Sequence, residues 1–128
     1  MELLYTGIIG FARVMFKVQG LDLRIRGARK FPEVGGAVVV MNHTGYLDFV
    51  YGGIPARVHK RFIRYMAKVE VFDHKVSGPI MRELKHIPVD RTAGKASFDE
   101  AVNRLRAGEL VGVFPEATIS RSFEIKGF

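Results

Sequence analysis

Cysteine and tryptophan are absent from this chain of 128 residues, and proline occurs only five times. Without cysteine there is no disulfide, no thiolate zinc site and no cysteine nucleophile, which fits a reducing compartment. No serine lies in a nucleophile-elbow pattern, and the glycine pairs at 35–36 and 52–53 lack the spacing and the lysine of a phosphate-binding loop. Chemistry through a covalent serine or cysteine intermediate is therefore poorly supported.

Three of the four histidines, His59, His74 and His86, have no second histidine or cysteine at metal-ligand spacing. We expect no metal site and interpret these three residues as surface or loop positions.

Acidic residues are outnumbered by basic ones, 13 against 20, which gives a formal net charge of +7. The expected partners are anionic: nucleic acid, an anionic membrane or phosphorylated small molecules. Aromatic residues are not interleaved with the basic runs as single-stranded nucleic acid would require, so we expect no nucleic-acid partner. The basic loop from Arg57 to Arg64 fits better as a contact with lipid headgroups.

A long uninterrupted hydrophobic run is also missing. Residues 1–18 are mostly apolar, but Arg13 and Lys17 interrupt them, and a spanning helix needs about 20 apolar residues. Two interpretations stay open: an amphipathic helix lying in the membrane interface, or a helix packed on the domain's own core. We divide the chain into an interfacial membrane-associated helix at 1–20 and an α/β domain at 21–128.

Short apolar runs alternate with helical patterns along the rest of the chain. Buried strands are expected at 37–41, 62–68 and 110–114, a half-exposed strand at 21–27, and an amphipathic helix at 95–107 with Phe98 in its apolar stripe. This alternation predicts an α/β fold with a mixed, largely parallel sheet flanked by helices.

The first expected buried strand ends in Asn42-His43, and Asp48 follows five residues after the histidine. Histidine suits a general base near neutral pH, and a carboxylate on one ring nitrogen would fix its tautomer. Five residues of helix turn by about 500°, so the pair can meet only if His43 precedes the first helical turn. The alternative is a structural histidine at a strand end and a solvated aspartate.

A second strand end carries Phe114-Pro115-Glu116-Ala117-Thr118. Glu116 there could bind a substrate hydroxyl or hold a neighbouring loop, and the alternative is a plain surface turn. Arg91, after Ile87-Pro88-Val89-Asp90, offers a forked donor for a phosphate, or alternatively a surface pair with Asp90.

Taken in order, Asn42-His43-x4-Asp48, Ile87-Pro88-Val89-Asp90-Arg91 and Phe114-Pro115-Glu116-Ala117-Thr118 resemble the motifs of the glycerolipid acyltransferase family, of the 1-acyl-sn-glycerol-3-phosphate acyltransferase type. The resemblance implies a glycerol-3-phosphate acyltransferase-like fold and an enzyme on the cytoplasmic side of the cell membrane. It implies that an acyl group passes from acyl-CoA or acyl-carrier protein, as co-substrate, to the free hydroxyl of a lysophospholipid, giving phosphatidic acid, and that no cofactor is needed.

The resemblance also implies residue roles. His43 would be the base, Asp48 would orient it, Arg91 would bind the acceptor phosphate, and Glu116 and Thr118 would shape the acceptor site.

Two positions depart from the family pattern: Ala117 stands where glycine is usual and Ile119 where arginine is usual, with Arg121 as a nearby substitute cation. Family members usually continue past residue 128, so we expect part of the sheet and a fourth motif for the acyl donor to be missing. The alternatives are another lysophospholipid or glycolipid acceptor, or an inactive basic fragment that binds membranes.

Overall fold

The computed structural model describes residues 2–116. Its helices and strands follow one another as α1 (Glu2–Val18), η1 (Ala28–Lys30), β1 (Ala37–Val40), α2 (Asp48–Ala56), η2 (Arg57–His59), β2 (Ile63–Lys68), α3 (Val69–Asp73), α4 (Ser77–Glu83), β3 (Ile87–Val89), α5 (Gly94–Arg106) and β4 (Leu110–Val113). Thr118 and Arg121 lie outside the described residues.

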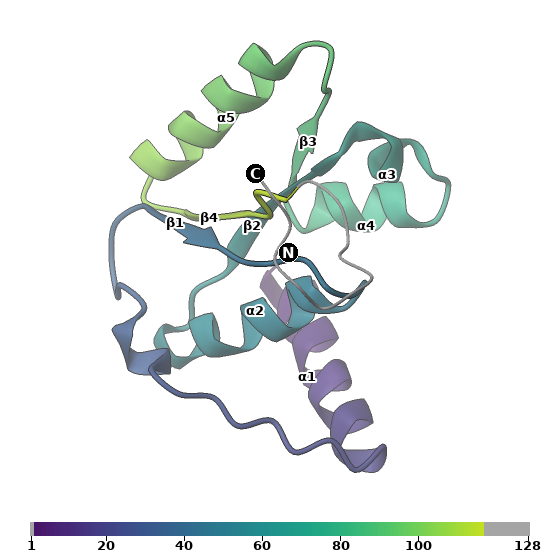
Figure 1. The fold of residues 1–128 in the computed structure, drawn as a ribbon, viewed down its shortest axis with the longest axis vertical. Helices are drawn as coiled ribbons and strands as arrows, with labels where there is room; N and C mark the ends of the chain where they lie inside the picture. The colour runs from purple at the N-terminus through teal and green to yellow at the C-terminus, as the bar shows by residue number, and fades with distance from the viewer. Residues whose placement is uncertain (1, 117–128) are drawn as a thin grey trace.

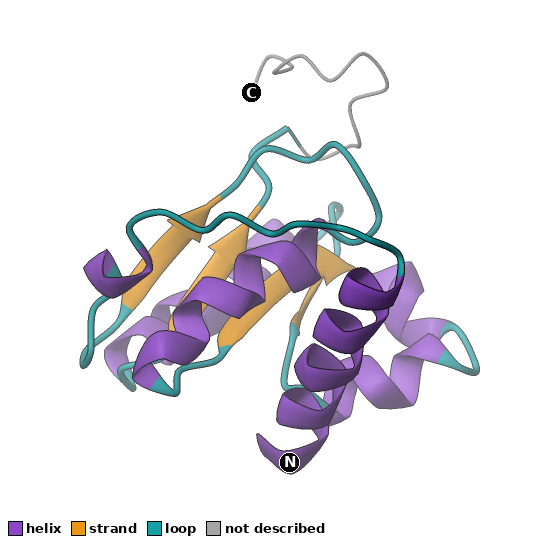
Figure 2. Ribbon diagram, turned by 90° about the horizontal axis from the view of Figure 1, so that it is seen from below, coloured by secondary structure: helices purple, strands orange, loops and turns teal. Residues whose placement is uncertain are grey.

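The strands form one four-stranded sheet in the order β1-β4-β2-β3, and every pairing in it is parallel. The arrows of all four strands therefore point the same way (Figure 2). This confirms the predicted α/β fold with a largely parallel sheet. Among residues 2–116 every strand of the sheet is parallel to its neighbours. A parallel arrangement also gathers the carboxyl ends of the strands at one edge, where such folds place their ligands.

Helices cover both faces of the sheet, α1 and α2 on one side and α5 on the other (Figure 1). Alternating strand residues supply the two cores. Ile63, Tyr65 and Leu110 pack with Ala56 of α2, whereas Val111 packs with Ala101 of α5. Phe98 does not join the second core as expected: its side chain is 66% exposed, because the buried stripe of α5 runs through Ser97 and Ala101 instead.

The strand expected at 21–27 is not present. The segment leaves α1 after Gly20, which has a positive φ of 75°, and has no regular secondary structure, with its apolar residues exposed at Leu21, Leu23 and Ile25. An alternating pattern predicts one polar and one apolar face, but a strand also needs a hydrogen-bonded neighbour. None of the four strands in the described residues pairs with this segment.

Helix α1 has two apolar faces rather than one. Tyr5, Ile9 and Phe16 are buried against Val50 and Ile54 of α2. A second stripe stays exposed on the other side of the helix, at Leu3, Phe11, Val14 and Val18. Packing on the core therefore accounts for only part of the apolar residues of α1, and the exposed stripe remains compatible with a membrane interface. Within residues 2–116, no helix combines the length and apolarity needed to cross a membrane.

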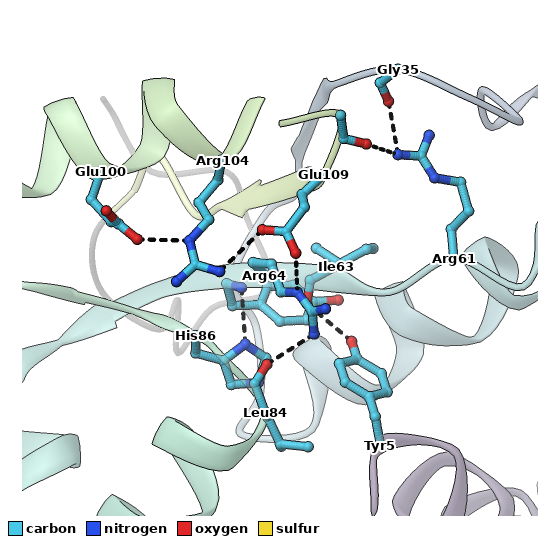
Figure 3. A network of polar contacts seen from close by, with 12 residues as sticks. Tyr5, Gly35, Arg61, Ile63, Arg64, Leu84, His86, Glu100, Arg104 and Glu109 are labelled. Atoms are coloured by element: carbon cyan, nitrogen blue, oxygen red, sulfur yellow. Dashed lines mark hydrogen bonds and ion pairs between the residues drawn. The ribbon is translucent and has the colours of Figure 1, made fainter. Parts of the chain in front are cut away.

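Two cations of the basic loop, Arg61 and Arg64, form hydrogen bonds within the protein (Figure 3). Arg61 donates to the carbonyls of Pro32, Gly35 and Gly108. Arg64 donates to Glu109 at 3.2 Å and to the carbonyl of Leu84 at 3.1 Å. These guanidinium groups tie loops together at the amino-terminal edge of the sheet, so both have acceptors within the protein, and the headgroup contact expected for this loop stays a prediction.

Arg104 of α5 extends the same network to the other face of the sheet. It pairs with Glu100 at 2.6 Å and with Glu109 at 3.2 Å (Figure 3). Glu109 thus bridges Arg64 and Arg104. The attraction between its negative charge and the two positive guanidinium groups offsets the cost of desolvating the three side chains.

His86 lies in the loop before β3, one of the two positions expected for it, but its side chain is buried rather than on the surface. It is 6% exposed, and its Nδ1 accepts the backbone N–H of Tyr65 at 3.0 Å (Figure 3). Burial, helped by the positive charge of Arg64, lowers the pKa of His86 from 6.5 to about 4. The folded protein therefore holds this ring neutral and uses it as a hydrogen-bond acceptor.

We expect the free energy of unfolding to fall as the pH drops from 6.5 to about 4. In that window the unfolded chain binds a proton at His86 and the folded chain does not, which costs roughly 3 kcal/mol in all. Urea unfolding at several pH values measures this. His86→Asn, which keeps an acceptor for the backbone N–H of Tyr65, should make the free energy of unfolding depend less on pH. His74→Asn, at an exposed histidine, should leave that pH dependence unchanged. An unchanged slope in His86→Asn would contradict the assignment.

Candidate active site

The turn after β1 carries the first predicted pair. The N–H of Met41 still bonds to the carbonyl of Val113 on β4 at 3.1 Å, and the chain then leaves the sheet. Helix α2 begins at Asp48, so His43 lies before its first turn, as the spacing of the pair demands. Nδ1 of His43 and Oδ2 of Asp48 are 2.9 Å apart. The structure thus brings the two side chains together.

Oδ2 of Asp48 also accepts two backbone hydrogen bonds, from the N–H of Thr44 at 2.6 Å and from the N–H of Gly45 at 2.8 Å. Burial raises the pKa of this carboxyl, but the hydrogen bonds from Gly45, His43 and Thr44 outweigh it and lower the pKa below its ordinary value. Asp48 is therefore ionised at neutral pH, and its charge sits at the first turn of α2, where the helix dipole favours an anion.

An ionised carboxylate can only accept hydrogen bonds, so Nδ1 of His43 must carry the proton that the pair shares. Nε2 of the neutral ring then has a free lone pair, as a base requires. The two side chains are only partly buried, 22% exposed for His43 and 14% for Asp48. A substrate can therefore reach the ring from solvent.

Glu116 joins these residues from the neighbouring strand. Val40 pairs with Val113, so His43 and Glu116, each three residues further on, lie side by side at the edge of the sheet. Oε1 of Glu116 accepts the backbone N–H of His43 at 3.0 Å, and the residue is 6% exposed. Of the two roles expected for Glu116, holding a neighbouring loop is the one that this contact fulfils.

Phe114 is a contact of His43 that the sequence analysis missed. The two rings stack with centroids 4.3 Å apart and planes 29° from parallel. Phe114 comes one residue after β4 and His43 three residues after β1, and these two strands pair in parallel, so their pairing was the signal that could have found the contact. Its ring restricts rotation of the imidazole on one side.

Arg91 lies at the same edge of the sheet, beyond the strand farthest from β1. Val89 of β3 pairs with Lys68 of β2, and Arg91 follows two residues later with its side chain exposed. The strand order puts β3 at the far end of the sheet from β1, three strand spacings or about 14 Å away. Oδ1 of the neighbouring Asp90 accepts hydrogen bonds from the backbone and side chain of Thr92.

A hollow of about 250 Å³ opens beside Asp48. Its lining consists of Met41, Asn42, Thr44, Asp48, Tyr51 and Gly52. The ring of Tyr51 stacks on Phe16 of α1, with centroids 5.0 Å apart, so the wall of the hollow reaches the N-terminal helix. Among residues 2–116 no cluster of His, Asp or Glu is arranged to hold a metal ion.

Comparison with known proteins gives the following. The family model described as Acyltransferase matches residues 22–128. A 1-acyl-sn-glycerol-3-phosphate acyltransferase of Bacillus subtilis is 30% identical over 110 residues, which cover 83% of this chain and 52% of that protein. An uncharacterized protein of Mycobacterium leprae is 34% identical over 111 residues, covering 83% of this chain and 28% of that protein.

The chain thus spans about half the length of the Bacillus relative and less than a third of the mycobacterial one. No solved structure matches it.

Proposed function

The chain belongs to the acyltransferase family, and on this premise we propose that it transfers an acyl group from an acyl thioester to the free hydroxyl of 1-acylglycerol 3-phosphate, giving phosphatidic acid. The observation that carries the proposal is the contact between His43 and Asp48, 2.9 Å from Nδ1 to Oδ2. The name of the Bacillus relative supports the acceptor, and acyl-CoA or acyl-carrier protein would supply the acyl group.

In this mechanism Nε2 of His43 takes the proton of the acceptor hydroxyl as the oxygen attacks the thioester carbonyl. A C–O bond forms, the C–S bond breaks, and the imidazolium returns its proton to the leaving thiolate. Asp48 stabilises the imidazolium through Nδ1 in the interval. No residue is acylated, which agrees with a chain that has no cysteine.

Acceptor binding is assigned to the carboxyl edge of the sheet. Arg91 would hold the phosphate by a forked, charge-assisted pair, since it lies at the same edge as His43. Glu116 would help to shape the acceptor site, and its carboxylate also accepts the backbone N–H of His43. Thr118 and Arg121, outside the described residues, complete the proposed acceptor site. The alternative acceptor, another lysophospholipid or a glycolipid, would use the same base.

We place the protein at the cytoplasmic surface of the cell membrane, with residues 1–20 as its interfacial segment. The exposed stripe of α1, centred on Phe11 and Val14, would enter the lipid. At about 100° per residue, Arg13 and Lys17 fall on the flank between the two apolar faces of α1, where they would meet headgroups. A lipid acceptor would then reach the hollow past Tyr51, next to α1.

His43→Ala should lower the rate of acyl transfer by at least about 100-fold, because general-base catalysis typically contributes that much or more. The measurement is transfer of labelled acyl-CoA to 1-acylglycerol 3-phosphate by the purified protein. His74→Ala, at an exposed histidine, serves as the control, and circular dichroism reports the fold. A His43→Ala protein that kept its rate would remove the proposed base.

Arg91→Ala should raise KM for 1-acylglycerol 3-phosphate about tenfold with little change in kcat, because a charge-assisted pair to the phosphate is lost. Monoacylglycerol, which lacks the phosphate, should show no such difference. Arg106→Ala at the end of α5 is the matched control for loss of one exposed cation. Equal KM values for Arg91→Ala and Arg106→Ala would exclude the phosphate role.

Phe11→Ser should weaken binding to phospholipid vesicles about tenfold, since burying a phenylalanine side chain is worth roughly 1.5–3 kcal/mol. Co-sedimentation with vesicles of mixed zwitterionic and anionic lipids measures this. Phe98→Ser makes the same change at an equally exposed position, 66% against 69%, on the opposite face of the sheet. If both variants bind as the unchanged protein does, the stripe on α1 is not the membrane contact.

A further inference from the structure

Tyr65 of β2 is a buried residue, 2% exposed, that contacts Phe49, the residue after Asp48, and Phe114, whose ring stacks on His43. Its hydroxyl donates to the carbonyl of Phe49 at 2.7 Å. Its ring stacks on Phe114, with centroids 5.9 Å apart and planes 16° from parallel.

Each of these contacts is one step from the proposed chemistry. Phe49 follows Asp48 in the first turn of α2, so a bond to its carbonyl fixes the turn from which the carboxylate projects. Phe114 stacks in turn on the imidazole of His43 at 4.3 Å. Tyr65 therefore links the helix that carries the carboxylate to the ring that carries the base.

Two glycines leave the space that Tyr65 occupies. A Cβ on Gly112, which pairs with Tyr65 across the sheet, would lie 2.5 Å from Cδ1 of the tyrosine ring. A Cβ on Gly52 of α2 would lie 2.9 Å from the tyrosine hydroxyl. A larger side chain at either position would collide with Tyr65. Because the ring is enclosed by both glycines, the tyrosine has little room to move aside.

The backbone of Tyr65 is anchored as well. Its N–H donates to Nδ1 of the buried His86 at 3.0 Å (Figure 3). Burial raises the pKa of the phenol, so the hydroxyl stays protonated and remains a donor to Phe49.

From this geometry we propose that Tyr65 is a positioning residue for the reaction: it sets the distance and angle between His43 and Asp48 through Phe114 and Phe49. The inference rests on the proposed function of that pair. A base and its orienting carboxylate must be held within fractions of an ångström for efficient proton transfer. His43 and Asp48 belong to a turn and a helix, and Tyr65, on a central strand, holds both.

Tyr65→Phe tests this, because it removes the hydroxyl and keeps the ring. We expect kcat to fall about fivefold, the loss that one hydrogen bond of typical strength predicts. KM for both substrates should stay unchanged, because Tyr65 is only 2% exposed and its hydroxyl is bonded to Phe49. The assay uses the 128-residue chain with acyl-CoA and 1-acylglycerol 3-phosphate.

Tyr5→Phe is the matched control. Tyr5 is 4% exposed, its hydroxyl also donates to a backbone carbonyl, that of Ile63 at 3.1 Å, and its ring also contacts His86. It lies at the amino-terminal edge of the sheet, away from His43. The two variants should lose similar amounts of thermal stability, and only Tyr65→Phe should lose kcat.

A second measurement does not depend on turnover. The Nδ1 proton of His43, observed by NMR, should exchange with solvent faster in Tyr65→Phe than in Tyr5→Phe, because the hydrogen bond to Asp48 is less well held. Equal kcat and equal exchange in the two variants would overturn the inference. His43→Ala separates the two levels: if it abolishes transfer while Tyr65→Phe does not differ from Tyr5→Phe, only the positioning role fails.

Discussion

One carboxylate oxygen, Oδ2 of Asp48, organises the site. It collects hydrogen bonds from the imidazole of His43 and from the backbone N–H groups of Thr44 and Gly45, all within 2.9 Å. These bonds join residues 43–45 to the first residue of α2, so the chain must bend directly after β1 and enter the helix within a few residues. The same bonds that shape the turn keep the carboxylate ionised, and an ionised acceptor sets the tautomer of the ring. The shape of the turn and the chemistry of the site therefore both depend on the carboxylate of Asp48.

The parallel sheet separates two kinds of polar residue. At its carboxyl edge lie His43, Glu116 and Arg91, where side chains face solvent or one another. At its amino-terminal edge, Arg61 and Arg64 bind backbone carbonyls and a carboxylate. Part of the positive charge of the chain is thus structural, and net charge alone overstates what is available to an anionic partner. Buried guanidinium groups with several acceptors stabilise loops more than they attract ligands.

Much of this could be predicted from the sequence wherever a pattern is local. The buried strands, helix α5 and the rule that His43 must precede a helix follow from short apolar runs and from helical geometry. The failures share one physical cause, since each depends on a neighbour distant in the chain. The segment at 21–27 has the alternation of a strand but no paired strand among the described residues, and His86 has no local signal for burial. Tyr65 likewise resembles any core tyrosine until its contacts to Phe49 and Phe114 are known.

Helix α1 shows why composition could not decide between membrane and core. An interfacial helix and a core helix both need one apolar stripe, and a strongly apolar segment can supply two. The inner stripe fixes α1 on α2, with Phe16 stacked on Tyr51 at the wall of the hollow beside Asp48. The outer stripe, which includes Phe11 and Val14, is left exposed. If α1 bound lipid through its outer stripe, the hollow would lie at a fixed place relative to the bilayer, because the inner stripe packs the helix against α2. If the acceptor is a lipid, as proposed, the same helix that attached the protein to the membrane would also bring the acceptor to the hollow.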